Sequence, residues 1–269
     1  MRTASGEKTQ VRDRVLPLQG IHNFRDYGGY STRGGKLRTG RLFRSGQHVD
    51  ATPSDLDLIA ALNIEKIVDL RGNHERTLYP CLRPREFSAE VLFADGETAG
   101  SGNAPHIEAA RDVATAEQAH AAMVRLYALM PFRPKLVEVL RLYFGALAES
   151  TGATLLHCLA GKDRTGLAAA LLHRLVGVHQ DDVMADYLLT NEAGNMERRI
   201  AAGAETVRAN FGPAMDDAAI RTLMSVHPEY LETAFAAIER EHGTLECYAR
   251  DVLAVSKPKL AAMEFRLVA

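Results

Sequence analysis

One segment near the middle of the chain constrains the fold more than any other. Ala153 to His157 is a short apolar run typical of a strand, and Gly166 to Val176 reads as an almost wholly apolar helix. The loop between them carries Cys158 directly after the strand. Because ligands in open α/β sheets bind outside the carboxyl ends of the strands, this order places the loop at a binding edge.

Apolar runs elsewhere indicate further strands at 37–43, 64–70 and 87–93. A short helix is expected after Thr52-Pro53, with longer ones at about 115–130 and 134–149 and four or five more over 180–256. Strands that alternate with helices predict an α/β sheet with a helical C-terminal half packed against it.

The expected domain organisation is simple. Residues 1–16 are polar and form a flexible arm, and 17–269 form a single domain. Residues 94–112 are small, polar and Gly-rich, and we interpret them as a long exposed loop. No internal repeat is visible.

Composition excludes several classes of protein. Lys and Arg number 32 against 34 Asp and Glu, a net charge of -2, which argues against a nucleic-acid surface. Three scattered cysteines indicate a reducing compartment. There is no N-terminal apolar signal segment and no run long enough to span a membrane. The expectation is a cytoplasmic protein, or one exported without such a signal; peripheral membrane contact and the oligomeric state stay open.

The loop sequence between Cys158 and Arg164 suits a bound phosphate. The N-terminus of the following helix offers free N–H groups and stabilises a thiolate at Cys158, which makes it a nucleophile. Gly161 permits a tight curl, and the planar Arg164 fork can bind two phosphate oxygens. The residues whose N–H groups or side chains would surround the anion are Leu159, Ala160, Gly161, Lys162, Thr165 and Gly166.

Three side chains in this loop have candidate roles in turnover. Thr165 can offer its hydroxyl to the thiolate, Lys162 would add positive charge at the rim, and Asp163 is a candidate proton donor. The pattern is not that of a P-loop NTPase, because that motif would need Gly at Leu156 and Ser or Thr at Asp163. A GxSxG elbow, an HExxH zinc motif and a zinc-binding cysteine cluster are also missing.

The segment HCLAGKDRTG at 157–166 resembles the active-site loop of the protein tyrosine phosphatase superfamily. Its Lys-Asp pair is similar to that of the atypical bacterial tyrosine phosphatases and lipid phosphatases of the tyrosine phosphatase family 3 type. The resemblance spans residues 17–268 and includes NFRDYGGY at 23–30, GRLFRSG at 40–46, VDLRGNHER at 68–76 and DYLLTN at 186–191.

This resemblance implies a central, mostly parallel sheet flanked by helices, with no metal and no cofactor. It implies Cys158 as the nucleophile and Arg164 as the phosphate binder. Substrates of the family are phosphotyrosine, sometimes phosphoserine or phosphothreonine, and often phosphoinositides. Relatives use helices near 94–149 as a lid, so we expect this insertion to cover the pocket.

Residues outside the loop have weaker expectations. Asn23, Arg25 and Asp26 are interpreted first as a hydrogen-bond cluster that pins a Gly-rich turn. Asp69 and Arg71 end a buried strand near Cys158, and we expect them to brace the loop. His157 is expected to orient the loop through hydrogen bonds rather than act as a base.

A few further positions stay ambiguous. Asp95 follows a predicted strand and is an alternative acid, since it would correspond to the movable acid loop of other tyrosine phosphatases. Tyr187 and Asn191 share a helix face and suit either the pocket or the core. Cys81 could protect Cys158 as a disulfide, although a packing role is favoured.

Two other functions compete with a phosphatase. A phosphate-binding module without turnover would lack the nucleophile, clamp or acid, yet all three are present. A sulfurtransferase also uses a cysteine in an anion-binding loop, but the Arg-Thr-Gly ending and the NFRD segment argue against it.

Overall fold

The computed structural model describes residues 14–100, 104–193, 196–211 and 215–269. Of the expected N-terminal arm, 1–16, residues 1–13 lie outside the described ranges. Residues 14–16 are attached to the domain, because Leu16 N donates to the Phe24 carbonyl at 2.9 Å and Val15 forms a bridge with Arg25. Residues 14–16 therefore make contacts with the domain.

The sheet has five strands in the order β1-β2-β5-β3-β4. β1 is antiparallel to β2, and every other neighbouring pair is parallel, so the expected mostly parallel α/β sheet is confirmed. The strands are β1 (Arg25–Asp26), β2 (Leu42–Ser45), β3 (Ile64–Asp69), β4 (Glu90–Leu92) and β5 (Ala153–His157).

The register brings the carboxyl ends of three strands to one edge of the sheet. His157, the last residue of β5, lies opposite Ser45 at the end of β2 and Asp69 at the end of β3. Parallel strands that end level with one another bring the residues after them together. The chain after β5, which begins with Cys158, thus emerges between the ends of its two neighbours.

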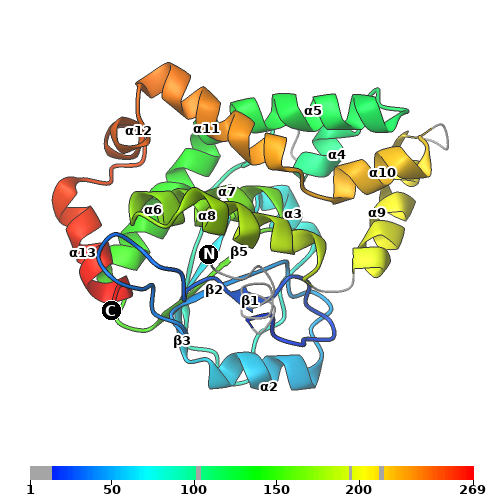
Figure 1. Cartoon of the computed structure of the whole chain (residues 1–269). Coiled ribbons are helices and arrows are strands. Elements are labelled where there is room, and N and C mark those ends of the chain that lie inside the picture. The colour runs from blue at the N-terminus through cyan, green and yellow to red at the C-terminus, as the bar shows by residue number, and fades with distance from the viewer. Residues whose placement is uncertain (1–13, 101–103, 194–195, 212–214) are drawn as a thin grey trace, which may run out of the picture.

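Helices surround the sheet in two unequal layers (Figure 1). α2 lies alone below the sheet in this view, whereas α6, α7 and α8 lie above it. The helices are α2 (Pro53–Ala61), α3 (Asn73–Leu78), α4 (Pro105–Ala109), α5 (Ala116–Leu129), α6 (Pro134–Glu149), α7 (Asp163–Leu175), α8 (Gln180–Leu188), α9 (Met196–Phe211), α10 (Asp217–Met224), α11 (Pro228–His242), α12 (Leu245–Asp251) and α13 (Lys257–Leu267), with 3-10 turns η1 (Met130–Phe132) and η2 (Leu189–Asn191).

Local sequence explains several helix starts. Thr52 caps α2, because its side chain accepts from Asp55 N while the Asp55 side chain accepts from Thr52 N. Thr115 and Gln118 form the same reciprocal cap at α5. α7 begins at Asp163, three residues before the expected start, so the second half of the functional loop already belongs to the helix.

Each face of the sheet has its own core. A small cluster that includes Phe43, Ile59 and Leu155 fills the α2 side. A much larger cluster on the other side joins Leu156 and Val68 to α6, α7 and the C-terminal helices. The almost wholly apolar helix expected at 166–176 lies in this second core as part of α7, in which every residue except Arg174 is buried.

Three expected elements differ from the structure. The strand predicted at 37–43 is formed by Leu42–Ser45, and Leu37 instead bridges Val268 near the C-terminus. The strand predicted at 87–93 shortens to Glu90–Leu92 at the sheet edge and is only partly buried. The loop expected at 94–112 contains the buried helix α4.

Among the described residues, no helix has the length and apolar character needed to cross a bilayer.

Candidate active site

The chain after β5 curls tightly in the 158–164 loop, and Gly161 makes this curl possible. Gly161 has a positive φ of 63°. A Cβ there would lie 2.5 Å from the Ser45 carbonyl carbon, so a larger residue would displace the end of β2. The Gly161 carbonyl accepts from Asn23 Nδ2 at 2.6 Å and from Arg44 Nη2 at 3.1 Å. The loop is therefore held from outside as well as by its own conformation.

Arg164 lies in the first turn of α7 and is held by an ion pair with Glu75 of α3. Its Nη1 and Nη2 donate to the two Glu75 carboxylate oxygens at 2.5 and 2.6 Å. Nη1 also donates to Thr98 Oγ1 at 2.8 Å and to the Leu70 carbonyl at 3.2 Å. Arg164 Nε is buried and has no partner among the described residues. The Nε–H of the guanidinium therefore remains for an incoming oxyanion.

Arg164 stays cationic in this environment. Burial by itself would lower its pKa, but the Glu75 carboxylate raises the pKa above its ordinary value. Cys158 lies in the same loop and is only 2% exposed. The nucleophile and the clamp predicted from the sequence are thus both buried, whereas Glu75 and Thr98 were not anticipated. Glu75 lies within the VDLRGNHER segment, which was the available signal.

A cavity of about 380 Å³ opens above the loop. Its lining includes residues from the loop, four helices and the segments before β1 and after β2: Leu159 and Ala160 of the loop, Glu75 and Leu78 of α3, His106 and Ile107 of α4, Ala202, Gly203 and Thr206 of α9, Met224 of α10, Gly20 and His22, and Gln47 and Asp50. The cavity is the entrance to the site, because it meets both the loop and the carboxylate that holds Arg164.

The helices of the expected lid insertion, 94–149, lie at different places relative to the cavity. Of the 94–149 insertion, α4 reaches the cavity, whereas α6 packs against β3, β4 and β5. The α6 side chains Leu136, Val139 and Phe144 are fully buried, so α6 forms part of the core. α9 and α10, which lie far beyond the insertion in sequence, form the other wall.

Lys162 does not lie at the rim of the site, contrary to expectation. Its side chain is fully buried and points to α10, where Nζ donates to the carbonyls of Leu223 and Ser225. A buried ammonium needs several acceptors, and backbone carbonyls at the end of α10, which lack a partner within the helix, supply them. Lys162 therefore ties the loop to a cavity wall.

Asp163 is 2% exposed and lies between α5 and α10. Its Oδ1 accepts from Tyr127 Oη at 2.9 Å and lies 3.4 Å from Lys162 Nζ. The alternative acid, Asp95, is exposed and accepts from Asn73 Nδ2 at 2.7 Å. The two carboxyls therefore occupy very different environments, one buried and one at the surface.

The NFRD segment supports the loop from β1. Arg25 Nη1 donates to Asn23 Oδ1, and Asn23 in turn holds the Gly161 carbonyl. Arg25 and Arg44 both pair with Asp186 of α8, at 3.3 and 2.7 Å. Burial would raise the pKa of Asp186, but the two arginines hold it well below its ordinary value. Asp186 is thus the shared anion of this cluster, and sequence reasoning missed it.

Asp26 has a separate, local task. Its two oxygens accept from Gly28 N at 2.7 Å and Gly40 N at 2.5 Å. It joins the Gly-rich turn after β1 to the turn before β2. Asn23 and Arg25 therefore support the 158–164 loop through hydrogen bonds, whereas Asp26 holds the two turns together.

Asp69 and Arg71 pair with each other and do not contact the loop directly. Arg71 Nε and Nη2 donate to Asp69 at 2.9 and 2.7 Å, and Nη1 donates to the Tyr79 carbonyl at 2.6 Å. Asp69 also lies 3.7 Å from His157 Nε2. Burial would raise the pKa of Asp69, but His157 and Arg71 hold it well below its ordinary value.

His157 is a neutral residue of the interior. Burial lowers its pKa to about 4, and its ring stacks on His48 with centroids 5.4 Å apart. Its Nδ1 lies 3.4 Å from the Cys158 carbonyl oxygen. A neutral, fully buried ring with these contacts orients the start of the loop.

Four further positions from the sequence are now located. Thr165 Oγ1 is buried with no hydrogen-bond partner among the described residues, so the expected bond to the Cys158 thiol is not formed here. Tyr187 Oη donates to Tyr127 Oη at 2.9 Å, and Asn191 binds the backbone of Val226 through both amide atoms. Cys81 is a free thiol that accepts from His48 N at 3.4 Å.

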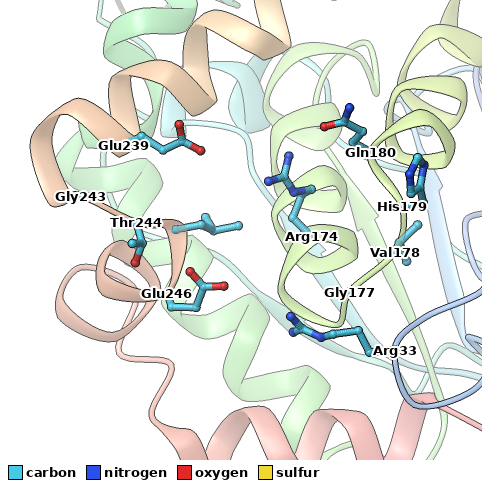
Figure 2. Close-up of a pocket in the computed structure, with 11 residues that line it drawn as sticks. Arg33, Arg174, Gly177, Val178, His179, Gln180, Glu239, Gly243, Thr244 and Glu246 are labelled. Atoms are coloured by element: carbon cyan, nitrogen blue, oxygen red, sulfur yellow. The ribbon is translucent and has the colours of Figure 1, made fainter.

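A larger cavity of about 460 Å³ lies at the other end of α7 (Figure 2). Arg33 and Arg174 approach it from one side, and Glu239 and Glu246 from the other. α7 has 13 residues, so roughly 20 Å of helix separates this cavity from the 158–164 loop. None of the loop residues lines it, so the smaller cavity is the candidate active site. Among the described residues, no group of three or more His, Cys, Asp or Glu side chains is placed to hold a metal ion.

Comparison with known proteins gives a consistent result. The tyrosine phosphatase family model matches residues 16–269. A "putative tyrosine-protein phosphatase" of Cupriavidus necator is 33% identical over 251 residues, covering 91% of this chain and 86% of that protein. "Triple specificity protein phosphatase PtpB" of Mycobacterium tuberculosis is 28% identical over 263 residues, covering 88% and 93%. The chain therefore belongs to the tyrosine phosphatase family and is a hydrolase of that type.

Proposed function

We propose that this protein hydrolyses phosphotyrosine, and also phosphoserine, phosphothreonine or phosphoinositide monoesters, through a phosphocysteine intermediate. The observation that carries the proposal is the arrangement of Arg164: Glu75 fixes its two terminal nitrogens, and its buried Nε has no partner among the described residues. A guanidinium held in this way is prepared to bind a phosphate oxygen within the loop that carries Cys158.

The proposed reaction has two steps. The Cys158 thiolate attacks phosphorus, the P–O ester bond breaks, and Asp163 gives its proton to the leaving oxygen. Water then attacks the phosphocysteine, the S–P bond breaks, and Asp163 takes a proton from that water. Inorganic phosphate and the thiolate are released, so no external oxidant or reductant is required. The N-terminus of α7 and Arg164 stabilise the charge that develops on the phosphoryl oxygens.

Variants of the nucleophile and the clamp test this proposal with p-nitrophenyl phosphate. Cys158→Ser should lose essentially all turnover yet still bind substrate, and Arg164→Ala should weaken both vanadate binding and turnover. Vanadate should inhibit the wild type, and chelators should leave its activity unchanged. Undiminished turnover by Cys158→Ser would sink the assignment, and cyanide-dependent sulfur transfer would favour the sulfurtransferase alternative.

The acid is tested by the leaving group. An alkyl phosphate needs protonation of its leaving oxygen, whereas p-nitrophenolate scarcely does. Asp163→Asn should therefore lower turnover of a phosphoserine peptide far more than turnover of p-nitrophenyl phosphate, and Asp95→Asn should show little contrast. If the contrast follows Asp95, the acid is Asp95 and Asp163 is a counter-charge to Lys162.

Substrate range is tested in one screen of phosphotyrosine, phosphoserine and phosphothreonine peptides and phosphoinositides. The name of the Mycobacterium tuberculosis relative states a triple specificity, which supports including all of these classes. Turnover confined to phosphotyrosine peptides would restrict the proposal to that substrate.

A further inference from the structure

A chain of hydrogen bonds joins the proposed acid to two other helices. Tyr187 of α8 donates to Tyr127 of α5 at 2.9 Å, and Tyr127 donates to Asp163 Oδ1 at 2.9 Å. Tyr127 is fully buried, while Tyr187 and Asp163 are 1% and 2% exposed. The carboxyl at the first position of α7 is thus fixed from outside its own helix.

The hydrogen bond that this carboxyl accepts falls on one oxygen, Oδ1. Tyr127 Oη and Lys162 Nζ both approach Oδ1, the latter at 3.4 Å. No hydrogen bond reaches Oδ2 from the residues that the structure describes. The two oxygens therefore have different surroundings. Oδ1 already accepts a hydrogen bond, so the proton of the neutral carboxyl can reside on Oδ2.

Tyr127 donates at any pH at which the enzyme would be assayed. Burial, with the Asp163 carboxylate as the next cause, raises the pKa of Tyr127 well above its ordinary value. Burial also raises the pKa of Tyr187, so the outer member of the pair stays protonated and keeps donating to Tyr127. The direction of the chain, from Tyr187 through Tyr127 to Asp163, is therefore constant.

We propose that Tyr127 is a positioning residue for the proton donor, holding Asp163 Oδ1 so that Oδ2 carries the proton delivered to the leaving oxygen. This inference rests on the proposed function, in which Asp163 is the acid. As the Oδ2–H bond breaks, negative charge spreads over the carboxylate, and the Tyr127 hydroxyl stabilises the part that appears on Oδ1. In the second step the same bond keeps Oδ2 free to take the proton of the attacking water.

A packing role is the alternative that the test must separate. The Tyr127 ring lies 5.4 Å from the Tyr230 ring and 6.4 Å from the Tyr187 ring, so it also fills space between helices. Tyr127→Phe keeps this ring and removes only the hydroxyl. The matched control is Tyr143→Phe, since Tyr143 is also fully buried and shares a 2.9 Å hydrogen bond with another tyrosine, Tyr27, in the core.

Turnover is measured with a phosphoserine peptide and with p-nitrophenyl phosphate, across pH. Tyr127→Phe should lower kcat about 10-fold for the peptide and less than about 3-fold for p-nitrophenyl phosphate, since only the first leaving group needs the acid. Losing a donor to the carboxylate disfavours its ionised form, so the alkaline fall of kcat should move to higher pH. Tyr143→Phe should change neither the ratio nor the profile.

Two further variants keep the test decisive if Tyr127→Phe is unstable. Tyr187→Phe retains the Tyr127–Asp163 bond, so it should leave the leaving-group ratio unchanged. In an Asp163→Asn background, Tyr127→Phe should add no further contrast, because the two residues act through one bond. An equal loss on both substrates without a pH shift, a contrast in Tyr187→Phe as large as that in Tyr127→Phe, or additive effects would each overturn the inference.

The outcomes also separate this inference from the proposed function. If Cys158→Ser is inactive and Asp163→Asn shows no leaving-group contrast, the enzyme is a cysteine phosphatase whose acid is elsewhere, and the role of Tyr127 fails alone. If Cys158→Ser turns over normally, the phosphatase mechanism itself fails.

Discussion

At the scale of single residues, Glu75 has the largest effect that the sequence did not indicate. Its carboxylate fixes both terminal nitrogens of Arg164, whose other hydrogen bonds to the described residues go to Thr98 and the Leu70 carbonyl. Glu75→Gln keeps the shape but cannot accept from both nitrogens. Because a misplaced clamp loses transition-state contacts, kcat/KM for p-nitrophenyl phosphate should fall about 100-fold. Steady-state kinetics and the vanadate inhibition constant measure this.

The neighbouring Glu97 supplies the control for that prediction. It is exposed, and among the described residues its hydrogen bond comes from the backbone N of His74, at 2.9 Å. Glu97→Gln should leave both constants within about 2-fold of the wild type, as is usual for surface substitutions. Normal vanadate inhibition of Glu75→Gln would show that Arg164 holds its position without this carboxylate.

Residues differ in how far the sequence alone could identify them. Cys158 and Arg164 follow from a fixed spacing within one loop, so their roles were readable from local order. Glu75 and Asp186 act on arginines 89 and 161 positions away in the chain, and only the fold brings them together. The prediction that Lys162 lies at the rim was wrong for the same reason, since the carbonyl that it binds lies on α10, far away in sequence.

At the scale of elements, the curl of the 158–164 loop depends on Gly161. An alanine there would adopt a positive φ and would also place its Cβ 2.5 Å from the Ser45 carbonyl carbon. The φ strain alone costs about 1–2 kcal/mol, and the contact with β2 adds to it. Gly161→Ala should therefore lower the unfolding free energy by more than this and reduce turnover at least about 100-fold, because the anion-binding N–H groups move.

A variant of Gly243 separates the cost of the φ strain from the cost of the contact with β2. It ends α11 with a φ of 77°, and a Cβ there would meet nothing within 4 Å. Gly243→Ala should show only the φ strain in urea unfolding and should leave turnover unchanged. If both variants lose the same stability and Gly161→Ala keeps its activity, the close approach to β2 does not shape the loop.

Elements with a strong periodic or apolar signal were predictable, and those set by tertiary contacts were not. β5 and α6 have the predicted bounds, because a buried strand and an amphipathic helix that begins with a proline are local patterns. α4 has only five residues and is stabilised by burial against its neighbours, so a Gly-rich sequence concealed it. The cavity wall formed by α9 and α10 has no local signature, since it depends on how these helices return over the loop.

At the scale of the whole molecule, buried histidines link stability to pH. Burial lowers the pKa of His48, His157 and His173, so all three are neutral in the folded protein near pH 6. In the unfolded chain they bind protons below about pH 6.5. The unfolded state therefore gains more protons as the pH falls from about 6.5 towards 4, and stability is lost over that window. For His157, with a pKa of about 4, the loss at pH 5 is about 2 kcal/mol.

The buried carboxylates act in a lower window. Asp69 and Asp186 have pKa values held below the ordinary 3.8 by their arginine and histidine neighbours, despite burial. Their contribution is present above about pH 4 and is lost only as the pH falls further. A decline in stability between pH 7 and pH 5 can therefore be assigned to the histidines.

His173 allows this assignment to be tested away from the active site. It is fully buried, and its Nε2 lies 2.8 Å from the Tyr27 carbonyl oxygen. His173→Asn removes the titrating ring, so the fall in unfolding free energy between about pH 7.5 and pH 5 should be smaller than in the wild type. Urea unfolding at both pH values measures it, and the exposed His74→Asn should decline in parallel with the wild type. Equal declines in all three proteins would mean that His173 is not held neutral, and that the acid sensitivity of the fold has another origin.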